Sequence, residues 1–386
     1  MSYFSNKIPL NPEKNQLLMQ LQSLKEKNVP IFDLTHSNPT LAGFEYPSEI
    51  FQNFQLPNYK PSPRGLVEAR EAICEYYSQK GRIISIDNIF LTTGSSESMS
   101  FCLKMLCDFG DEVCLPSPGY PLYDYIAKLE NVKPIYYSLK KQELHWRMDF
   151  QSLENRINHK TKAIVIVQPN NPTGNILTKG EIEALIELAF KNKLVLIVDE
   201  VFSDYCYEND FLHLTSNHAP VITLNGISKI AGLPQLKLGW FILEGNQEFT
   251  QTAIDSMETI ADTYLSVNTP IQMILGQILE NAGSIQMQIR DRLTKNLKRF
   301  KGLFGNQKRI TYHIPEGGWY IVFSILGCID GDEFCLNLLT QKFVFVYPGY
   351  MFDFMEEDIF VISLLTPEIE FNEGLRRLMD FTMWEY

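Results

Sequence analysis

The sequence predicts an α/β fold in which a large domain has a mostly parallel sheet covered by helices, and both chain ends build a small α+β domain. Two observations predict it. Between residues 89 and 243, apolar runs of strand length alternate with segments of helical periodicity. After residue 310, short strand-like runs mix with helical ones. With 386 residues, 45% of them hydrophobic, the chain is long enough for one large core and a smaller lobe.

The middle of the chain supplies the large sheet. Six largely apolar runs are expected to be strands, at residues 89–91, 112–115, 163–167, 194–198, 221–224 and 238–243. Helices are expected at 97–107, at 123–129, and from the capping box that begins at Thr178 to about residue 192. Strands that are apolar throughout are typical of parallel sheets covered on both faces.

Both chain ends lie outside this pattern. An N-terminal helix is expected at residues 12–27, because leucines recur there at helical spacing. A long basic amphipathic helix is expected at residues 285–304, and the tail beyond residue 310 is expected to pack with the N-terminal segment. We therefore place the large domain at residues 46–284 and the small domain at residues 1–45 and 285–386.

Composition excludes several classes of function. A net charge of −12 argues against nucleic acid as a partner, because phosphate binding needs a basic face. No apolar run reaches the roughly 20 residues that span a bilayer, and the N-terminus has no signal-peptide pattern. The seven cysteines form no CxxC and the six histidines no HxxxH or HxH pair, so no metal site is expected. We expect a cytoplasmic protein with reduced thiols.

Polar residues follow the predicted strands, where open α/β sheets bind their ligands. Gly94-Ser95-Ser96 stands between a strand and a helix, where it can bind a phosphate or simply cap the helix. Asp199 ends an apolar strand, so its carboxylate needs a partner. The partner could be a buried cation such as a protonated pyridine nitrogen, or a structural salt bridge or helix cap.

Two lysines and a tyrosine extend this set. Ser228-Lys229 follows a strand; such a lysine is commonly a solvated surface residue, but a desolvated one becomes a carbonyl nucleophile. Lys237 stands eight residues further on and is a candidate phosphate partner. Tyr120 follows Pro118-Gly119 and could stack on a ring or pack in the core.

Taken in order, these residues resemble the class I/II aminotransferases, which are fold-type I enzymes dependent on pyridoxal 5'-phosphate. The resemblance covers nearly the whole chain. It rests on Tyr59-Lys60-Pro61-Ser62-Pro63-Arg64-Gly65 with Arg70, Gly94-Ser95-Ser96, Pro118-Gly119-Tyr120, Asn171-Pro172-Thr173-Gly174, Asp199-Glu200, Ser228-Lys229, Lys237-Leu238-Gly239-Trp240, Pro315-Glu316-Gly317-Gly318 and Pro348-Gly349.

The resemblance implies a role for each residue. Lys229 would carry the cofactor as a Schiff base and then move a proton between the substrate and the cofactor. Asp199 would keep the pyridine nitrogen protonated, and Asn171 would bind the ring hydroxyl. Tyr120 would stack on the ring. The phosphate would be held by Ser95, Ser96, Ser228 and Lys237, where lysine stands in place of the family's usual arginine. Tyr59 would reach the cofactor of a neighbouring subunit, which implies a homodimer.

Two departures from the family pattern concern the cofactor and the substrate. Phe202 stands where the family usually has a tyrosine that bonds the ring hydroxyl. Val361 stands where the family has the arginine that clamps the substrate carboxylate, and an apolar residue cannot form that charge-assisted pair. Either another residue supplies the clamp, Arg64 being a candidate by position, or the substrate is not held as an ordinary α-amino acid.

Three functions remain open from the sequence. The first is an aminotransferase that moves an amino group between an amino acid and a 2-oxo acid. The second is a lyase, decarboxylase or synthase with the same cofactor, which the missing arginine favours. The third is a non-catalytic regulator built on the fold; the acidic charge and the absence of an added DNA-binding segment in this sequence argue against it.

Overall fold

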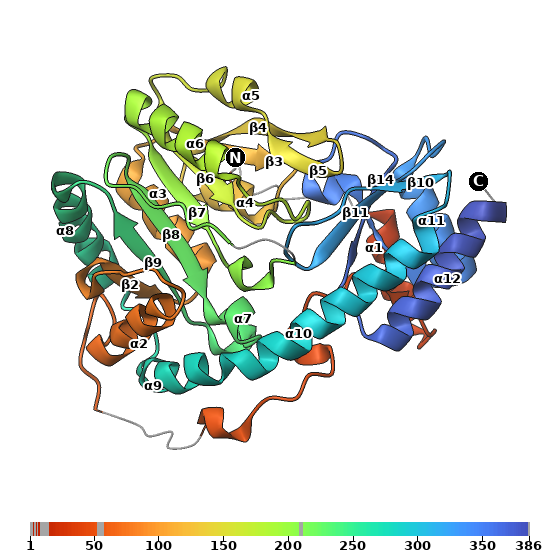
Figure 1. Cartoon of the computed structure of the whole chain (residues 1–386), viewed down its shortest axis with the longest axis horizontal. Coiled ribbons are helices and arrows are strands. Elements are labelled where there is room, and N and C mark those ends of the chain that lie inside the picture. The colour runs from red at the N-terminus through yellow and green to blue at the C-terminus, as the bar shows by residue number, and fades with distance from the viewer. Residues whose placement is uncertain are drawn as a thin grey trace.

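An eight-stranded sheet, a four-stranded sheet and a two-stranded pair form the framework of the described residues, which are 3, 5, 7, 15–51, 58–207 and 211–384 of this computed structural model (Figure 1). The strand order in the large sheet is β2-β9-β8-β7-β6-β3-β4-β5. Its strands are β2 (Ile89–Thr92), β3 (Glu112–Ser117), β4 (Lys133–Gln142), β5 (His145–Met148), β6 (Thr161–Val167), β7 (Val195–Asp199), β8 (Val221–Gly226) and β9 (Gly239–Glu244).

The large sheet is mostly parallel, as predicted. Strands β8, β7, β6, β3 and β4 run parallel to their neighbours in that series, whereas β9 is antiparallel to both β8 and β2, and β5 is antiparallel to β4. The six predicted strands are all present, with ends that differ by up to two residues. Their uniform apolar character follows from burial on both faces: β7 and β8 are buried along their whole length.

Helices cover both faces of this sheet. Alternate residues of β6 point to opposite faces, so Val165 packs with helices α3 (Ser95–Leu106), α4 (Leu122–Leu129) and α8 (Gln247–Tyr264), whereas Ile164 packs with α6 (Lys179–Asn192). The β2 and β9 side of the sheet is covered by α2 (Val67–Ser78), α7 (Ile227–Ile230) and α9 (Thr269–Met273). The short helix α5 (Phe150–Glu154) packs beside β4.

A smaller half is formed by both chain ends, in agreement with the predicted fold class. Its antiparallel sheet has the order β10 (Ile310–Tyr312), β11 (Tyr320–Ile325), β14 (Ile359–Ser363) and β13 (Tyr347–Pro348). The N-terminal strand β1 (Phe32–Asp33) pairs in parallel with β12 (Val344–Phe345). Around these strands lie α1 (Gln16–Glu26), α11 (Gly331–Lys342) and α12 (Glu368–Trp384). Residues 12–14 of the predicted first helix lie outside the described residues, and Asn15 caps α1.

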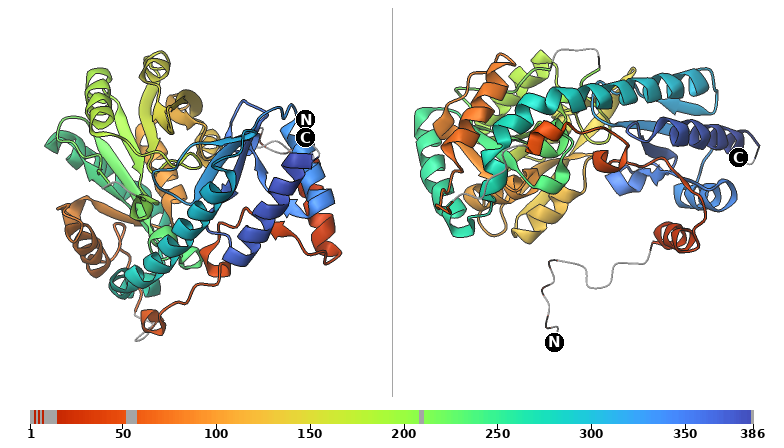
Figure 2. Two further views of the ribbon diagram at one scale, coloured as in Figure 1. Left: turned by 45° about the vertical axis from the view of Figure 1, so that its right-hand side comes forward. Right: turned by 90° about the horizontal axis from the view of Figure 1, so that it is seen from below.

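Helix α10 (Leu275–Phe304) connects the two halves. It begins ten residues before the predicted start at residue 285, because its first three turns lack the basic residues on which that prediction rested. Those turns still present buried Leu275, Ile278 and Ala282 at helical spacing, and they pack on α2. Figure 2 shows α10 running from the large half to α12 in the small half.

The capping box at α6 provides a test of the local structure. The Thr178 hydroxyl accepts the Glu181 N–H at 3.2 Å, and a Glu181 carboxylate oxygen accepts the Thr178 N–H at 2.8 Å. We expect Thr178→Ala to lower the free energy of unfolding by about 1 kcal/mol, because the Glu181 N–H loses its partner. Urea denaturation measures this. Thr178→Ser keeps the hydroxyl and should unfold like the parent, so equal losses in both variants would contradict the capping role.

Candidate functional site

A cavity of about 430 Å³ lies where strands of the large sheet end and the small half begins. The large half supplies residues that directly follow or end strands, namely Ser95, Ser96, Tyr120, Pro121, Leu122, Tyr123, Val167, Asn171, Asp199, Val201, Phe202, Ser228 and Lys229. The small half supplies Ser37, Tyr320, Tyr347, Met351 and Phe352. Seven of the nine predicted site residues therefore meet in one cavity; Tyr59 and Lys237 do not line it.

Lys229 is held in α7, one turn of helix directly after β8. Its Nζ lies 4.5 Å from the centre of the Trp319 ring and 5.2 Å from that of Phe202. Burial lowers the pKa of the Lys229 ammonium to about 8, and the nearby negative charge of Asp199 opposes part of that effect. A substantial fraction of this amine is therefore neutral near physiological pH, which suits a nucleophile toward a carbonyl group.

Asp199 is the last residue of β7 and is 5% exposed. Its Oδ2 accepts a hydrogen bond from the Tyr123 hydroxyl, and its Oδ1 accepts the Val201 N–H at 3.0 Å. Burial raises the pKa of the Asp199 carboxyl to about 6, although both hydrogen bonds act in the opposite direction. Such a carboxylate is stabilised by a cation placed in the cavity beside it.

Ser95 and Ser96 begin α3, so the positive end of this twelve-residue helix faces the cavity. Gly94 precedes them with a φ of +152°. Gly239 of β9 packs against this turn so closely that a Cβ there would lie 2.7 Å from the Gly94 Cα. The predicted phosphate partner Lys237 stands two residues before Gly239, which pairs with Thr92, so the Lys237 backbone lies beside the turn while its side chain is exposed.

Asn171 and Tyr120 come from two loops that follow β6 and β3. Asn171 is 7% exposed, and its Oδ1 has no hydrogen-bond partner among the described residues. An unpaired buried amide at a cavity wall is satisfied when a polar ligand occupies that cavity. Tyr120 is 43% exposed, and its ring packs edge-on against Tyr123 with centroids 6.4 Å apart.

Three residues singled out in the sequence lie away from the cavity of this chain. Tyr59 is 66% exposed, beside residues 265–270. Arg64 donates from Nε to the Glu258 carboxylate at 2.6 Å, so it is not the clamp in this chain's own cavity. Val361 is fully buried in β14.

Several wall residues were not predicted from the sequence. Tyr123 stands three residues after Tyr120, in the first turn of α4, and its place at the start of a helix gave no sign of the bond to Asp199. Tyr320 and Tyr347 stand beside the Gly317-Gly318 and Pro348-Gly349 motifs, whose glycines and prolines drew attention instead. A signal was therefore present in the sequence at each of these positions, as a tyrosine adjoining a family motif.

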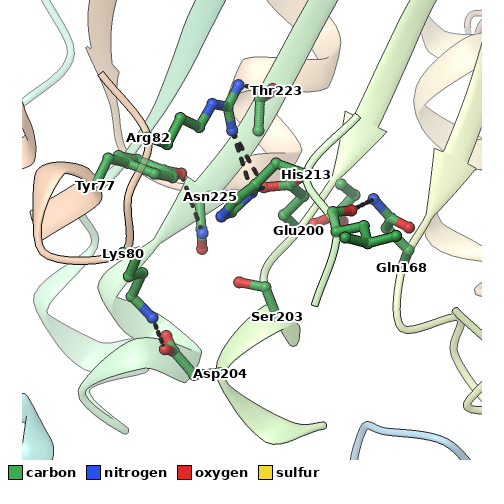
Figure 3. Close-up of polar contacts among 12 residues, drawn as sticks. Tyr77, Lys80, Arg82, Gln168, Glu200, Ser203, Asp204, His213, Thr223 and Asn225 are labelled. Carbon is green, nitrogen blue, oxygen red and sulfur yellow. Dashed lines mark hydrogen bonds and ion pairs between the residues drawn. The ribbon is translucent and has the colours of Figure 1, made fainter. Parts of the chain in front are cut away.

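A buried charge network is centred on Glu200, the residue that follows Asp199 in sequence; Figure 3 shows Glu200 with Arg82 and His213. Glu200 is fully buried, and its Oε2 lies 2.7 Å from His213 Nδ1 and 3.4 Å from an Arg82 nitrogen. Arg82 also bonds Glu244, and it donates to the Thr223 hydroxyl at 2.9 Å. Since Glu200 adjoins Asp199 and its N–H bonds the Leu224 carbonyl oxygen, this network anchors the end of β7.

Comparison with known proteins agrees with this geometry. The sequence matches the family "Aminotransferase class I and II" over residues 48–378. The chain belongs to this family. A glutamate-pyruvate aminotransferase, AlaA of Haemophilus influenzae, is 30% identical to this aminotransferase over 372 residues, which cover 93% of this chain and 92% of the relative. A tyrosine aminotransferase of Caenorhabditis elegans is 25% identical over 97% of this chain and 80% of its own length.

Solved structures give the same assignment for the aminotransferase fold. The alanine aminotransferase from Pyrococcus furiosus has a TM-score of 0.90 at 25% identity, covering 98% of this chain and 99% of the other. An aminotransferase from Escherichia coli has a TM-score of 0.89, also at 25% identity, covering 100% and 99%. The predicted fold-type I architecture and transaminase class are thereby confirmed. In the described part of this aminotransferase, no helix is both long and apolar enough to cross a bilayer.

The network centred on Glu200 predicts a large loss of stability when its cation is removed. We expect Arg82→Met to lower the free energy of unfolding by about 3–5 kcal/mol, because Glu200 would remain buried without its guanidinium partner. Arg376→Met is the matched control, since Arg376 bridges Glu373 and Asp380 on the exposed face of α12. Urea denaturation of both variants compares them; a similar loss in the two would contradict the role of the buried network.

Proposed function

We propose that this aminotransferase binds pyridoxal 5'-phosphate in the 430 Å³ cavity through Lys229 and moves an amino group between an amino acid and a 2-oxo acid. The observation that carries the proposal is the joint presence of Lys229 and Asp199 in one cavity wall. The lysine has a pKa lowered to about 8, and the aspartate is buried without a cationic side chain bonded to it. These are the two groups that the aldehyde and the pyridine nitrogen of the cofactor require.

The other wall residues fit the remaining groups of this cofactor. Asn171 lines the cavity, and its side-chain amide is suited to the ring hydroxyl. The N-terminus of α3, with Ser95 and Ser96, is suited to a phosphate, to which Ser228 and Lys237 would add a hydroxyl and a charge. Tyr120 would stack on the ring face.

Bound pyridoxal phosphate supplies an electron-withdrawing ring that stabilises negative charge at the substrate Cα. The protein then has two tasks. Lys229 Nζ, an amine with a pKa near ambient pH, would serve as the base and acid for the proton at the substrate Cα. Asp199 would face the ring nitrogen and favour its protonated form, and Tyr123 and the Val201 N–H keep the Asp199 carboxylate in place.

We further propose a homodimer located in the cytoplasm, with no nucleic acid or membrane partner. Tyr59 supports the dimer, because its exposed side chain lies outside this chain's own cavity and is free to reach the phosphate in a second copy. The large domain would comprise residues 46–284, with residues 1–45 and 285–386 as the small domain. The pairing of β1 with β12 supports the grouping of the two chain ends.

Lys229→Ala tests the cofactor anchor. We expect the variant to lack the visible absorbance band of lysine-bound pyridoxal phosphate and to lose transaminase activity, with an unchanged far-ultraviolet circular dichroism spectrum. Lys237→Ala is the matched lysine control, and it should bind the cofactor more weakly but show the same band at saturation. A full band in Lys229→Ala would rule out Lys229 as the anchor.

The pKa of Lys229 predicts how cofactor loading depends on pH. The neutral amine is the nucleophile, so the rate of band formation after mixing apoprotein with pyridoxal phosphate should rise with pH, with a midpoint near 8. The negative charge of Asp199 raises the pKa of Lys229, so Asp199→Asn should move the midpoint to lower pH. Stopped-flow absorbance measures both profiles. A parent midpoint above pH 10, as for a solvated lysine, would refute the assignment.

A further inference from the structure

We propose that this site selects its amino donor by an uncharged, aromatic-sized body, and that neutral hydroxyl groups contact the substrate carboxylate in place of a guanidinium. The proposal rests on the proposed function and specifies its substrate class. It predicts weak discrimination between an amino acid and the amine that lacks its carboxylate, and rejection of donors with a charged side chain.

The small number of charged residues in the cavity wall supports the proposal. Within the described part of the chain, Lys229 and Asp199 are the wall residues that carry charge at neutral pH. Both are assigned to the cofactor, so the part of the wall that the described residues of this chain build offers no further cation to a substrate anion. Two arginines that could bind a substrate carboxylate have other partners. Arg64 bonds Glu258, and Arg292 donates to the carbonyl oxygens of Ala42 and Leu365. A second carboxylate on the substrate would therefore be buried unpaired, which is costly.

The small sheet explains why position 361 matters. Val361 of β14 lies directly opposite Val322 of β11 and Tyr347 of β13, and Tyr320 lies opposite Ser363. Opposed residues and residues two apart share a face, so Tyr320, Val361 and Tyr347 point to the same side of this sheet. The two tyrosines line the cavity, whereas the short Val361 side chain is fully buried beside them. Because position 361 is a valine, no charged side chain reaches the cavity from between Tyr320 and Tyr347.

An aromatic surface occupies this wall. The Phe352 ring packs at 6.1 Å from Tyr320 and at 5.7 Å from Tyr347, measured between ring centres. Met351 stands beside Phe352 and also lines the cavity. Aromatic rings and a flexible thioether favour a large apolar partner, because it buries area and gains ring–ring contacts.

The small half offers a carboxylate the hydroxyls of wall residues, among them those of Ser37 and Tyr320. Ser37, in the segment after β1, lies near Tyr320 and acts to lower the pKa of its phenol, against the larger effect of burial, and both residues line the cavity. A hydroxyl can donate to a carboxylate oxygen, but it brings no positive charge. These hydroxyls can therefore bind a substrate carboxylate, but they give an amino acid little advantage over the amine that has a hydrogen atom in its place.

Matched amino donors test the proposal in the loaded enzyme. L-Phenylalanine and 2-phenylethylamine differ by the carboxylate, and single-turnover loss of the visible cofactor band gives a rate and an apparent affinity for each. For each donor we divide the single-turnover rate constant by the apparent dissociation constant. We expect the two quotients to agree within about tenfold, since a neutral hydrogen bond contributes little net binding free energy. We expect L-aspartate to be poorer than phenylalanine by more than about tenfold. A preference for phenylalanine over its amine of more than about a hundredfold, or brisk use of aspartate, would overturn the proposal.

A binding measurement tests the hydroxyls without turnover. The unreactive 3-phenylpropanoate should bind the loaded enzyme and perturb the cofactor absorbance. Tyr320→Phe and Ser37→Ala should each weaken this binding by a few-fold to about tenfold while leaving the band intact. Tyr312→Phe in β10, outside the cavity wall, is the matched control and should bind like the parent. Unchanged binding in both wall variants would refute the role of the hydroxyls.

The outcomes separate this inference from the proposed function. If the parent protein shows no visible band with pyridoxal phosphate, the proposed function fails and the substrate class fails with it. If the band forms and is discharged by dicarboxylic donors in preference to apolar ones, the proposed function stands and the substrate class is wrong. Val361→Arg adds a gain-of-function arm, because a guanidinium on this face should tighten 3-phenylpropanoate binding by more than about tenfold.

Discussion

The burial of one carboxylate at the end of β7 determines much of the arrangement around it. Asp199 lies at the point where the large sheet stops, and its charge is stabilised by Tyr123 and by the Val201 N–H. Next to it in sequence, Glu200 is paired with Arg82 and hydrogen-bonded with His213, so the strand end is fixed by partners other than those of Asp199. The cavity in front of it contains Lys229, whose pKa is lowered by the same lack of water. A bound pyridinium would stabilise the Asp199 carboxylate, and an aldehyde would react with the neutral Lys229 amine, which is why the pair is more informative than either residue alone.

The two halves of the molecule divide the chemistry between them. Residues that directly follow strands of the large sheet, such as Ser95 and Lys229, line the part of the cavity proposed for the cofactor. The small half contributes Tyr320, Tyr347 and Phe352, which face the remaining space and carry no charge. The two departures from the family pattern are divided in the same way: Phe202 lies in the large-half wall near Lys229, and Val361 lies in the small sheet between Tyr320 and Tyr347.

The predictability of each element follows from how it is buried. Strands β6 and β7 were located from the sequence because burial on both faces leaves uninterrupted apolar runs. The β4–β5 hairpin was not located from the sequence, since β4 is largely exposed and mixes polar with apolar residues. Asp199 and Lys229 could be assigned because each adjoins a strand end. Ser37, Tyr320 and Tyr347 could not, because they are far apart in the sequence and meet only when the small half packs against the large one. The exposed side chain of Lys237 likewise depends on the local turn, which residue identity does not specify.

Helix α10 has a mechanical consequence for this cavity. Its 30 residues span roughly 45 Å at 1.5 Å per residue, with one end packed on α2 and the other on α12. The walls of the cavity belong to the two halves, and α10 extends through both of them. Widening the cavity therefore requires the small half to pivot about α10 or the helix itself to bend. The width of the substrate space is set by the stiffness of one helix as much as by the side chains that line it.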